Sequence, residues 1–439
     1  MSEKIRSRVR DTILQALSAG VVPRTGIQHI QVGRHREIKE LLRDIERISG
    51  GGAGIRFVIG DYGSGKTFFL NLVREMALHK KLVTVQADLS PDLRLYSSRG
   101  QSRALYSELL RGMSTRSRPD GGALTSVVER FVMSAISQAE SEGCSPDEII
   151  ARRMDSLTDL VGGFDFAAVI RTYWEACDGD DSERKQNAIR WLRGEFSTKT
   201  EARQVLGVRT IVDDSTVYDH LKLMALFCRL AGYSGLLVCI DELVSIYMLQ
   251  NSIARRGNYE VLLRVVNDSI QGNTSGIGFV MAGTPEFLQD HRRGINSHEA
   301  LSSRLAGNSF ATGGLVDFTG PVIRLQNLTQ EDLYILLGKI RNVFRSCEDT
   351  TLEFPDEAIT AFMKHCMERI GEAYFRTPRT SIRSFVQLLS VLDQNPGARW
   401  EELVNQTDVA ADSPVALTEI VDDESEGQTE DDELATFRL

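Results

Sequence analysis

One stretch limits what this chain can fold into more than any other: GDYGSGKT, at residues 60–67. The apolar residues 55–59 before it predict a short buried strand, and the apolar-periodic residues 68–73 after it predict the start of a helix. A glycine, four residues and then Gly-Lys-Thr, set between a strand and a helix, form the phosphate-binding loop pattern. The sequence therefore predicts an α/β fold with a nucleotide site at this turn.

Each type of residue in the loop has a predicted task. The glycines let the backbone curl until its N–H groups point inward, where the N-terminus of the helix adds partial positive charge. Lys66 is expected to reach the β- and γ-phosphates of ATP, and the hydroxyl of Thr67 to ligate Mg²⁺. The alternative is a structural glycine turn followed by a surface lysine. The predicted nucleotide-binding residues of the loop are Gly60, Asp61, Tyr62, Gly63, Ser64, Gly65, Lys66 and Thr67.

A second apolar run, residues 236–240, ends in Asp241 and Glu242. Such a run is typical of a central parallel strand whose C-terminal tip holds a metal. Asp241 is predicted to hold Mg²⁺ through its water shell. Glu242 is predicted to orient and deprotonate the attacking water, as expected of a hydrolase.

Three further polar residues follow apolar runs. Residues 278–284 predict a strand that lies between the other two, so Thr284 at its tip is a candidate sensor of the γ-phosphate and the attacking water. A satisfied turn threonine is the alternative. Arg255 and Arg256 are expected on a loop at the same edge of the sheet, where contact with a nucleic acid is one interpretation.

Composition divides the chain unevenly. Residues 408–439 carry eleven of the 61 acids and one of the 51 bases, which leaves 50 of each sign in the rest. We therefore expect a neutral body and an acidic, disordered tail. The predicted units are an N-terminal helix (1–26), a core (27–95 and 211–327), a helical insertion (96–210), a helical lid (328–405) and the tail (406–439).

The sequence contains neither an apolar leader nor a run of 18 apolar residues, so no membrane contact is expected. Its six cysteines show no CxxC spacing and are expected to be reduced thiols in the cytoplasm. The histidines show no HExxH pattern, and no metal other than the Mg²⁺ of the nucleotide is predicted.

The VGR turn at residues 32–34 resembles the base-binding box of AAA+ ATPases, especially the branch of initiators and helicase loaders. The resemblance implies that Val32 and Gly33 lie against the adenine. It also implies that Arg304 projects into the site of a neighbouring subunit, with Arg292 and Arg293 as substitutes, and that Arg379 reaches the γ-phosphate from the helical lid. Arg383 is the alternative to Arg379. A surface position is the simpler explanation for Arg304.

Longer segments resemble the ATP-binding proteins of bacteriophage-exclusion (BREX) defence systems, of the type called BrxD. These segments are AGVVP (19–23), IQVGRHREI (30–38), RFVIGDYGSGKTFFL (56–70), AIRWLRGE (188–195) and GYSGLLVCIDEL (232–243). AIRWLRGE discriminates best, because it lies outside any general ATPase motif. The resemblance implies partnership with a defence helicase and other BREX components, on double-stranded DNA.

Two hypotheses follow for the function. In the first, an AAA+ protein with a parallel-sheet core, a helical insertion and a C-terminal lid hydrolyses ATP, forms a homo-oligomer, contacts DNA and loads or regulates a helicase. In the second, the chain is a slow nucleotide-gated switch or scaffold that recruits protein partners. Both hypotheses use Lys66, Asp241 and Glu242.

Overall fold

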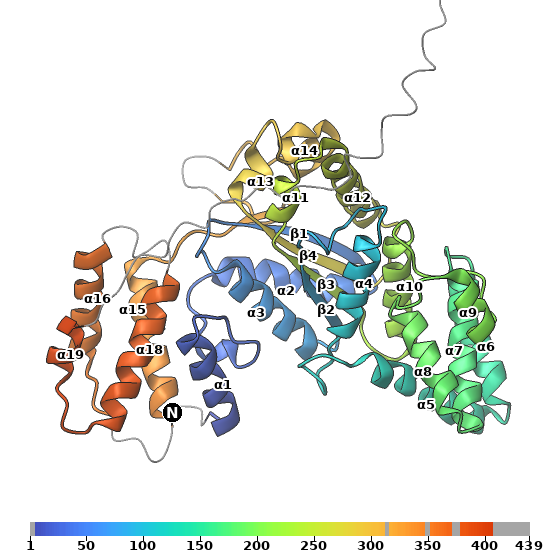
Figure 1. Ribbon diagram of the computed structural model, residues 1–439, viewed down its shortest axis with the longest axis horizontal. Helices are drawn as coiled ribbons and strands as arrows, with labels where there is room; N and C mark the ends of the chain where they lie inside the picture. Colours follow the sequence, from blue (N-terminus) through green and yellow to red (C-terminus); the bar gives the residue numbers. More distant parts are fainter. Residues whose placement is uncertain (1–4, 312–315, 347–351, 371–377, 407–439) are drawn as a thin grey trace, which may run out of the picture.

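The computed structural model describes residues 5–311, 316–346, 352–370 and 378–406. Its centre is a sheet of five strands in the order β2-β3-β4-β1-β5, and all neighbouring strands are parallel (Figure 1). The strands are β1 (Ala53–Ile59), β2 (Val83–Asp88), β3 (Leu236–Asp241), β4 (Ile277–Gly283) and β5 (Val322–Arg324).

The predicted strands are confirmed, with ends that differ by one or two residues. Strand β4 lies between β1 and β3, as expected. Every residue of β1, β3 and β4 is buried. Central strands of a parallel sheet are covered on both faces, which explains why their sequences are continuous apolar runs.

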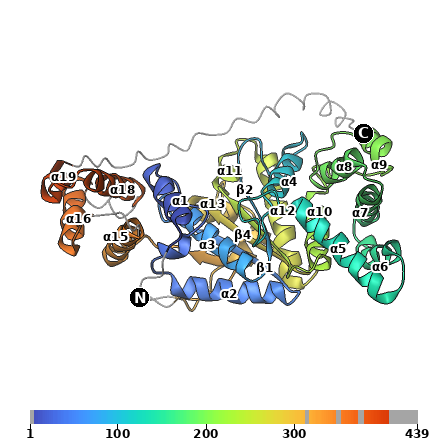
Figure 2. The same cartoon turned by 90° about the horizontal axis from the view of Figure 1, so that it is seen from below.

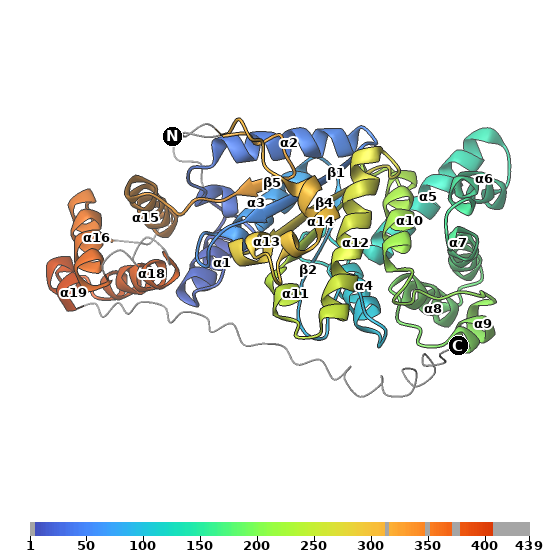
Figure 3. The same ribbon diagram turned by 90° about the horizontal axis from the view of Figure 1, so that it is seen from above.

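Helices cover both faces of the sheet (Figures 2 and 3). On one face, α2 (His35–Ser49) and α3 (Lys66–His79) pack on strand residues such as Val58. On the other face, α10 (Val217–Leu230) and α12 (Ser252–Gln271) share a cluster with residues such as Phe57. Adjacent residues of a strand point to opposite faces, so the sheet builds two cores.

The region between β2 and α10 is helical, as its periodicity predicts. It contains α4 (Gln101–Arg111), α5 (Leu124–Glu142), α6 (Pro146–Thr158), α7 (Gly163–Asp178), α8 (Ser182–Leu192) and α9 (Lys199–Leu206). Phe131 and Phe166 pack against Phe227 of α10, with ring centroids 5.1 and 5.4 Å apart. These helices therefore share one hydrophobic core with the sheet.

A second group of helices packs around its own core at the other end of the molecule (Figure 1). We call α15, α16, α18 and α19 the C-terminal helical unit. Helix α1 (Ser7–Ser18), the predicted N-terminal helix, packs against it through Ile13 and Leu17. The helices of the unit are α15 (Gln330–Arg345), α16 (Asp356–Ile370), α18 (Pro378–Gln394) and α19 (Trp400–Gln406). The predicted acidic tail lies outside the described residues, apart from its first residue, Gln406.

The remaining elements of the fold are short helices. The prediction of a loop at Arg255 and Arg256 was wrong. These elements are η1 (Ile27–His29), α11 (Val244–Met248), α13 (Pro285–Gln289), η2 (Ile295–Ser297) and α14 (Glu299–Leu305). Arg255 and Arg256 are not on a loop but in α12, because the Asn251 side chain caps that helix just before them. Gly257, which suggested a loop, is a helical position against which the Tyr96 ring packs.

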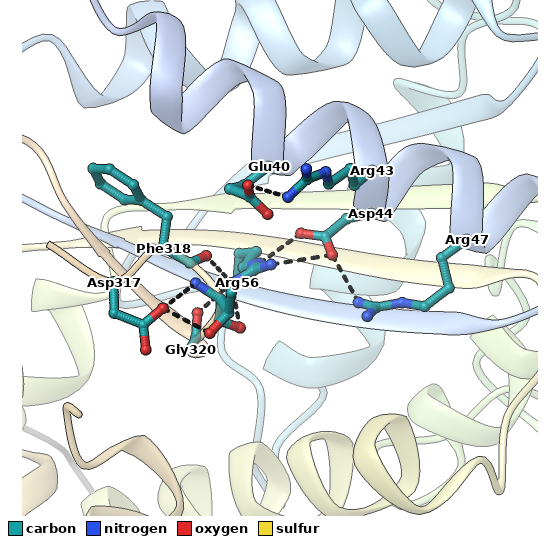
Figure 4. Close-up of polar contacts among 9 residues, drawn as sticks. Glu40, Arg43, Asp44, Arg47, Arg56, Asp317, Phe318 and Gly320 are labelled. Carbon is teal, nitrogen blue, oxygen red and sulfur yellow. Dashed lines mark hydrogen bonds and ion pairs between the residues drawn. The ribbon is translucent and has the colours of Figure 1, made fainter. Parts of the chain in front are cut away.

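A buried ion pair fastens α2 to β1 (Figure 4). Arg56 Nε lies 2.5 Å from Asp44 Oδ2, and both side chains are less than a tenth exposed. The Arg56 guanidinium also donates to the backbone carbonyls of residues 318–320, which lead into β5. This one arginine thus connects a covering helix, a central strand and the edge of the sheet.

Candidate functional site

The phosphate loop connects β1 to α3 and needs its glycines. Gly63 and Gly65 adopt φ angles of 82° and 85°, in the left-handed region that glycine occupies without strain. A Cβ at Gly60 would lie 2.4 Å from Ser64 Oγ and 3.1 Å from the Leu325 carbonyl oxygen. The backbone therefore curls too tightly for side chains at these positions.

Lys66 opens α3 and folds back onto the loop. Its ammonium donates hydrogen bonds to the carbonyl oxygens of Gly60, at 2.9 Å, and Asp61, at 3.0 Å. Burial lowers the pKa of Lys66, while Asp241 and then Glu242 oppose the shift. A buried ammonium with only two carbonyl partners is suited to exchange them for the oxygens of a phosphate.

The structure brings Thr67 and the two acids of β3 together. Thr67 Oγ1 donates to Asp241 Oδ2 at 2.7 Å, and Glu242 follows the tip of the strand with its backbone N–H bonded to Asp241 Oδ1 at 2.8 Å. Asp241 is only 2% exposed. Burial, followed by the charge of Asp241, raises the pKa of Glu242, which is typical of a carboxylate tuned as a general base.

Two hydroxyl groups at this edge are buried without a hydrogen-bond partner among the described residues. They are Ser64 Oγ in the loop and Thr284 Oγ1. Thr284 is 1% exposed and begins α13 directly after β4, which lies between β1 and β3. Buried polar groups are normally paired. Two orphaned oxygens beside a curled glycine loop therefore fit a polar ligand such as a triphosphate.

The Thr67 hydroxyl and the Asp241 carboxylate also suit Mg²⁺, which prefers oxygen ligands and keeps several waters. Among the residues that the structure describes, no group of three or more His, Cys, Asp or Glu side chains could hold a metal by itself. A magnesium ion here would need the phosphates and water as its remaining ligands. This is the usual arrangement in nucleotide sites.

The VGR turn at residues 32–34 lies against the C-terminal helical unit. Val32 and Phe68, the latter from the first turn of α3, are half-buried against the core of that unit. Gly33 has a φ of 64°, and a Cβ there would lie 3.1 Å from Asp332 Oδ1 at the start of α15. The turn is therefore placed between the phosphate loop and the helices predicted to form a lid.

The candidate arginines have partners within their own chain. Arg304, in α14, donates to Asn267 Oδ1 and, at 2.8 Å, to the Ala300 carbonyl oxygen. Arg293 donates to the carbonyl oxygens of Met248 and Leu249, and the backbone N–H of Arg292 donates to Asp290. These contacts hold Arg292 and Arg293 near the end of α11, and they hold Arg304 against the C-terminal half of α12.

Arg379 lies on α1. Its Nε donates to the Gly20 carbonyl oxygen, and both Arg379 and Arg383 lie within 4 Å of the position that a Cβ of Gly20 would occupy. The sequence predicted a contact with the γ-phosphate for Arg379. In the structure this side chain joins α18 to the segment after the N-terminal helix, and its contact with the γ-phosphate stays a prediction.

Sequence reasoning missed two residues of the site. Asp88, at the tip of β2, is in register with Asp241, and burial and then the charge of Asp241 raise its pKa. The carboxyl ends of parallel strands meet at one edge of a sheet. The position of Asp88 at the end of an alternating apolar segment could therefore have indicated that it lies near Asp241. Arg34 donates to the Ser64 carbonyl oxygen at 2.6 Å. Its position within the VGR turn carried no sign of that contact.

None of the helices in the described part of the chain combines the length and apolarity needed to cross a membrane.

Comparison with known proteins supports the nucleotide site. A search of curated proteins found no match. The family model described as BREX system ATP-binding protein BrxC/D matches residues 5–408, which include the sheet, the helical insertion and the C-terminal helical unit. The chain therefore belongs to the BrxC/D family of ATP-binding proteins of the BREX phage-defence system.

Proposed function

We propose that the chain is an ATPase of the AAA+ class, of the BrxD type, and that it hydrolyses ATP at the phosphate loop. One observation carries the proposal. The hydroxyl of Thr67 and the carboxylate of Asp241 meet at 2.7 Å, with Glu242 as the next residue. A half-buried carboxylate beside this pair is where hydrolysis, unlike nucleotide binding alone, requires a base.

Each residue then has a role. Lys66 releases its two carbonyl partners and binds the phosphates, while Thr67 and Asp241 hold Mg²⁺. The magnesium ion, when bound, neutralises charge that develops on the phosphates. Glu242 accepts a proton from the attacking water, which forms a bond to the γ-phosphorus as the bond to ADP breaks. Thr284 orients that water and the γ-phosphate through its unpaired hydroxyl.

Two variants test the active site. Lys66→Ala is expected to abolish ATP binding, whereas Glu242→Gln is expected to bind ATP and lose turnover by about 100-fold or more. Asp92→Asn is the control, because Asp92 is exposed on the loop after β2. Unchanged turnover in both test variants would exclude this site as the site of hydrolysis.

We also propose that the chain forms a homo-oligomer with nucleotide and that Arg304 completes the neighbouring site. Its support is the resemblance to AAA+ ATPases, together with the exposed position of Arg304 on α14. In mixtures of Arg304→Ala with Glu242→Gln, one kind of interface carries both changes and another carries neither. Turnover in the mixture should therefore exceed that of either variant alone. Turnover equal to the average of the separate variants would rule out a shared site.

Contact with double-stranded DNA and regulation of a BREX helicase are further proposals, supported by family membership. The test for DNA is the ATPase rate with and without duplex DNA over a series of salt concentrations, because phosphate contacts weaken as salt rises. Stimulation that disappears at high salt is expected. No binding at low salt would favour the second candidate function.

That second candidate is a slow nucleotide-gated switch, and the position of Lys66 favours it. The ammonium donates to the carbonyl oxygens of Gly60 and Asp61, so it must release them when it binds phosphates. A lysine that changes its partners in this way can report nucleotide binding without rapid turnover. Turnover that is slow, unaffected by DNA and still dependent on Glu242 would support this candidate.

A further inference from the structure

Arg34 occupies an unusual position just before α2. Its φ is 60°, in the left-handed region that costs a residue with a side chain about 1 kcal/mol or more. Local strain of this kind persists where surrounding contacts hold the residue in place. The hydrogen bonds of its guanidinium group are the contacts that hold Arg34 in this conformation.

A single nitrogen of Arg34 joins two segments that are far apart in the sequence. Arg34 Nη2 donates to the Ser64 carbonyl oxygen at 2.6 Å and to the Gln326 carbonyl oxygen at 3.0 Å. Ser64 belongs to the phosphate loop. Gln326 belongs to the linker that connects β5 to α15. The guanidinium therefore bridges the phosphate loop and the linker that leads from β5 into α15.

The turn that carries Arg34 is itself fastened to α15. Asp332 lies against Gly33 and also completes the N-terminal cap of α15 through Thr329. Further along the helix, the Lys339 ammonium donates to the Gln31 carbonyl oxygen. These contacts join α15, from its N-terminal cap to Lys339, to the turn at residues 31–34.

The bridge has the properties of a strong interaction. Burial lowers the pKa of Arg34, and the carboxylates of Glu37 and Asp332 oppose this shift. Arginine stays charged in proteins, and hydrogen bonds from a charged donor are shorter and about twice as strong as neutral ones. Displacing either carbonyl oxygen would leave a partly buried N–H without its partner.

We propose that Arg34 is a positioning residue that couples the phosphate loop to the C-terminal helical unit. When phosphates enter, Lys66 releases Gly60 and Asp61, and the backbone around Ser64 shifts. Arg34 keeps both of its hydrogen bonds only when the linker at Gln326 shifts as well. Nucleotide occupancy is therefore transmitted to α15. The inference rests on nucleotide binding at this loop but not on hydrolysis.

Hydrogen–deuterium exchange of the full chain, with and without the slowly hydrolysed analogue ATPγS and Mg²⁺, tests this coupling. In the wild type, the analogue should change exchange in residues 60–67 and also in residues 326–337. In Arg34→Ala, the change at 60–67 should remain and the change at 326–337 should be lost. Affinity for the analogue should fall by no more than about tenfold, the effect of one charge-assisted hydrogen bond.

Arg36→Ala is the matched control, because Arg36 is exposed on the first turn of α2. It should respond as the wild type does. Should Arg34→Ala not fold, Arg34→Lys carries the same test, since lysine keeps the charge but not the planar fork of donors.

Two results would overturn the proposal. One is a change at 326–337 that is as large in the Arg34 variants as in the wild type. The other is loss of analogue binding in variants that keep the wild-type melting temperature, which would make Arg34 a binding residue. A wild-type chain that does not bind the analogue at all would instead refute the proposed function.

Discussion

Thr67 and Asp241 form a hydrogen bond of 2.7 Å although 174 positions separate them in the chain. Thr67 lies in the first turn of the helix after β1, and Asp241 ends β3, two strands away in the sheet. The fold therefore brings the two sequence motifs together, as the proposed site for ATP and Mg²⁺ requires.

Removing either side of this pair should affect Mg²⁺-dependent turnover in the same way. Thr67→Val and Asp241→Asn each remove a ligand for the metal that screens the phosphates, so turnover should fall by about 100-fold. Titration of the ATPase rate with Mg²⁺ measures the effect. A rate curve that both variants leave unchanged would contradict the assignment of the metal site.

Turnover should depend on pH through Glu242. The base must be deprotonated, and burial together with Asp241 raises the pKa of Glu242 above its ordinary value. As the pH falls, activity should therefore be lost at a higher pH than the ordinary glutamate value of about 4.3.

The charge of Asp88 contributes to that shift. Asp88→Asn removes a neighbouring negative charge, so it should lower the pKa of Glu242 and move the acid limb of the rate profile to lower pH. Profiles of kcat against pH for the wild type and this variant provide the test. An acid limb at the same pH in both proteins would contradict the influence of Asp88.

The Asp44–Arg56 pair should be essential for stability. Arg56→Met leaves a buried carboxylate with only the exposed Arg47 as a partner. The free energy of unfolding should fall by about 3 kcal/mol or more. Urea unfolding measures this quantity.

Arg43→Met, on the same helix, is the control (Figure 4). Arg43 is more than half exposed and pairs with Glu40 at 2.5 Å. Exposed pairs contribute about 1 kcal/mol or less. Equal losses in the two variants would contradict a special role for the buried pair.

His220 should make the protein sensitive to acid. It is 1% exposed between Tyr106 and Trp191, its Nδ1 bonds the Thr216 carbonyl oxygen at 3.0 Å, and burial lowers its pKa. The unfolded chain then binds a proton at a higher pH than the folded one. Stability should therefore fall as the pH drops below about 6.5, the ordinary value for histidine.

His220→Gln removes the titrating group. The loss of stability between pH 7.5 and 5.5 should therefore be smaller in this variant than in the wild type, by at most about 1.4 kcal/mol per pH unit. Urea unfolding at the two pH values compares them. An identical loss in both proteins would show that other groups cause the acid sensitivity.

Much of the fold could be predicted because it depends on local patterns. Apolar runs marked strands β1, β3 and β4, and helical periodicity marked the region between β2 and α10. The same reasoning failed at Arg255 and Arg256, where Gly257 and Asn258 suggested a loop. There Tyr96 packs on the glycine and the buried Asn258 side chain holds the backbone N–H groups of the segment at 95–96, so tertiary contacts make a helix of a loop-like sequence.

The sequence by itself determined the phosphate loop, the acidic tip of β3 and the order of the strands that bear them, because glycine spacing and apolar runs express local backbone requirements. Only the tertiary structure decided the partners of Arg34, Arg56 and Arg379. A long arginine side chain can reach many carbonyl and carboxylate oxygens. Which of them it meets depends on how distant segments pack, and no short-range pattern in the sequence records that choice.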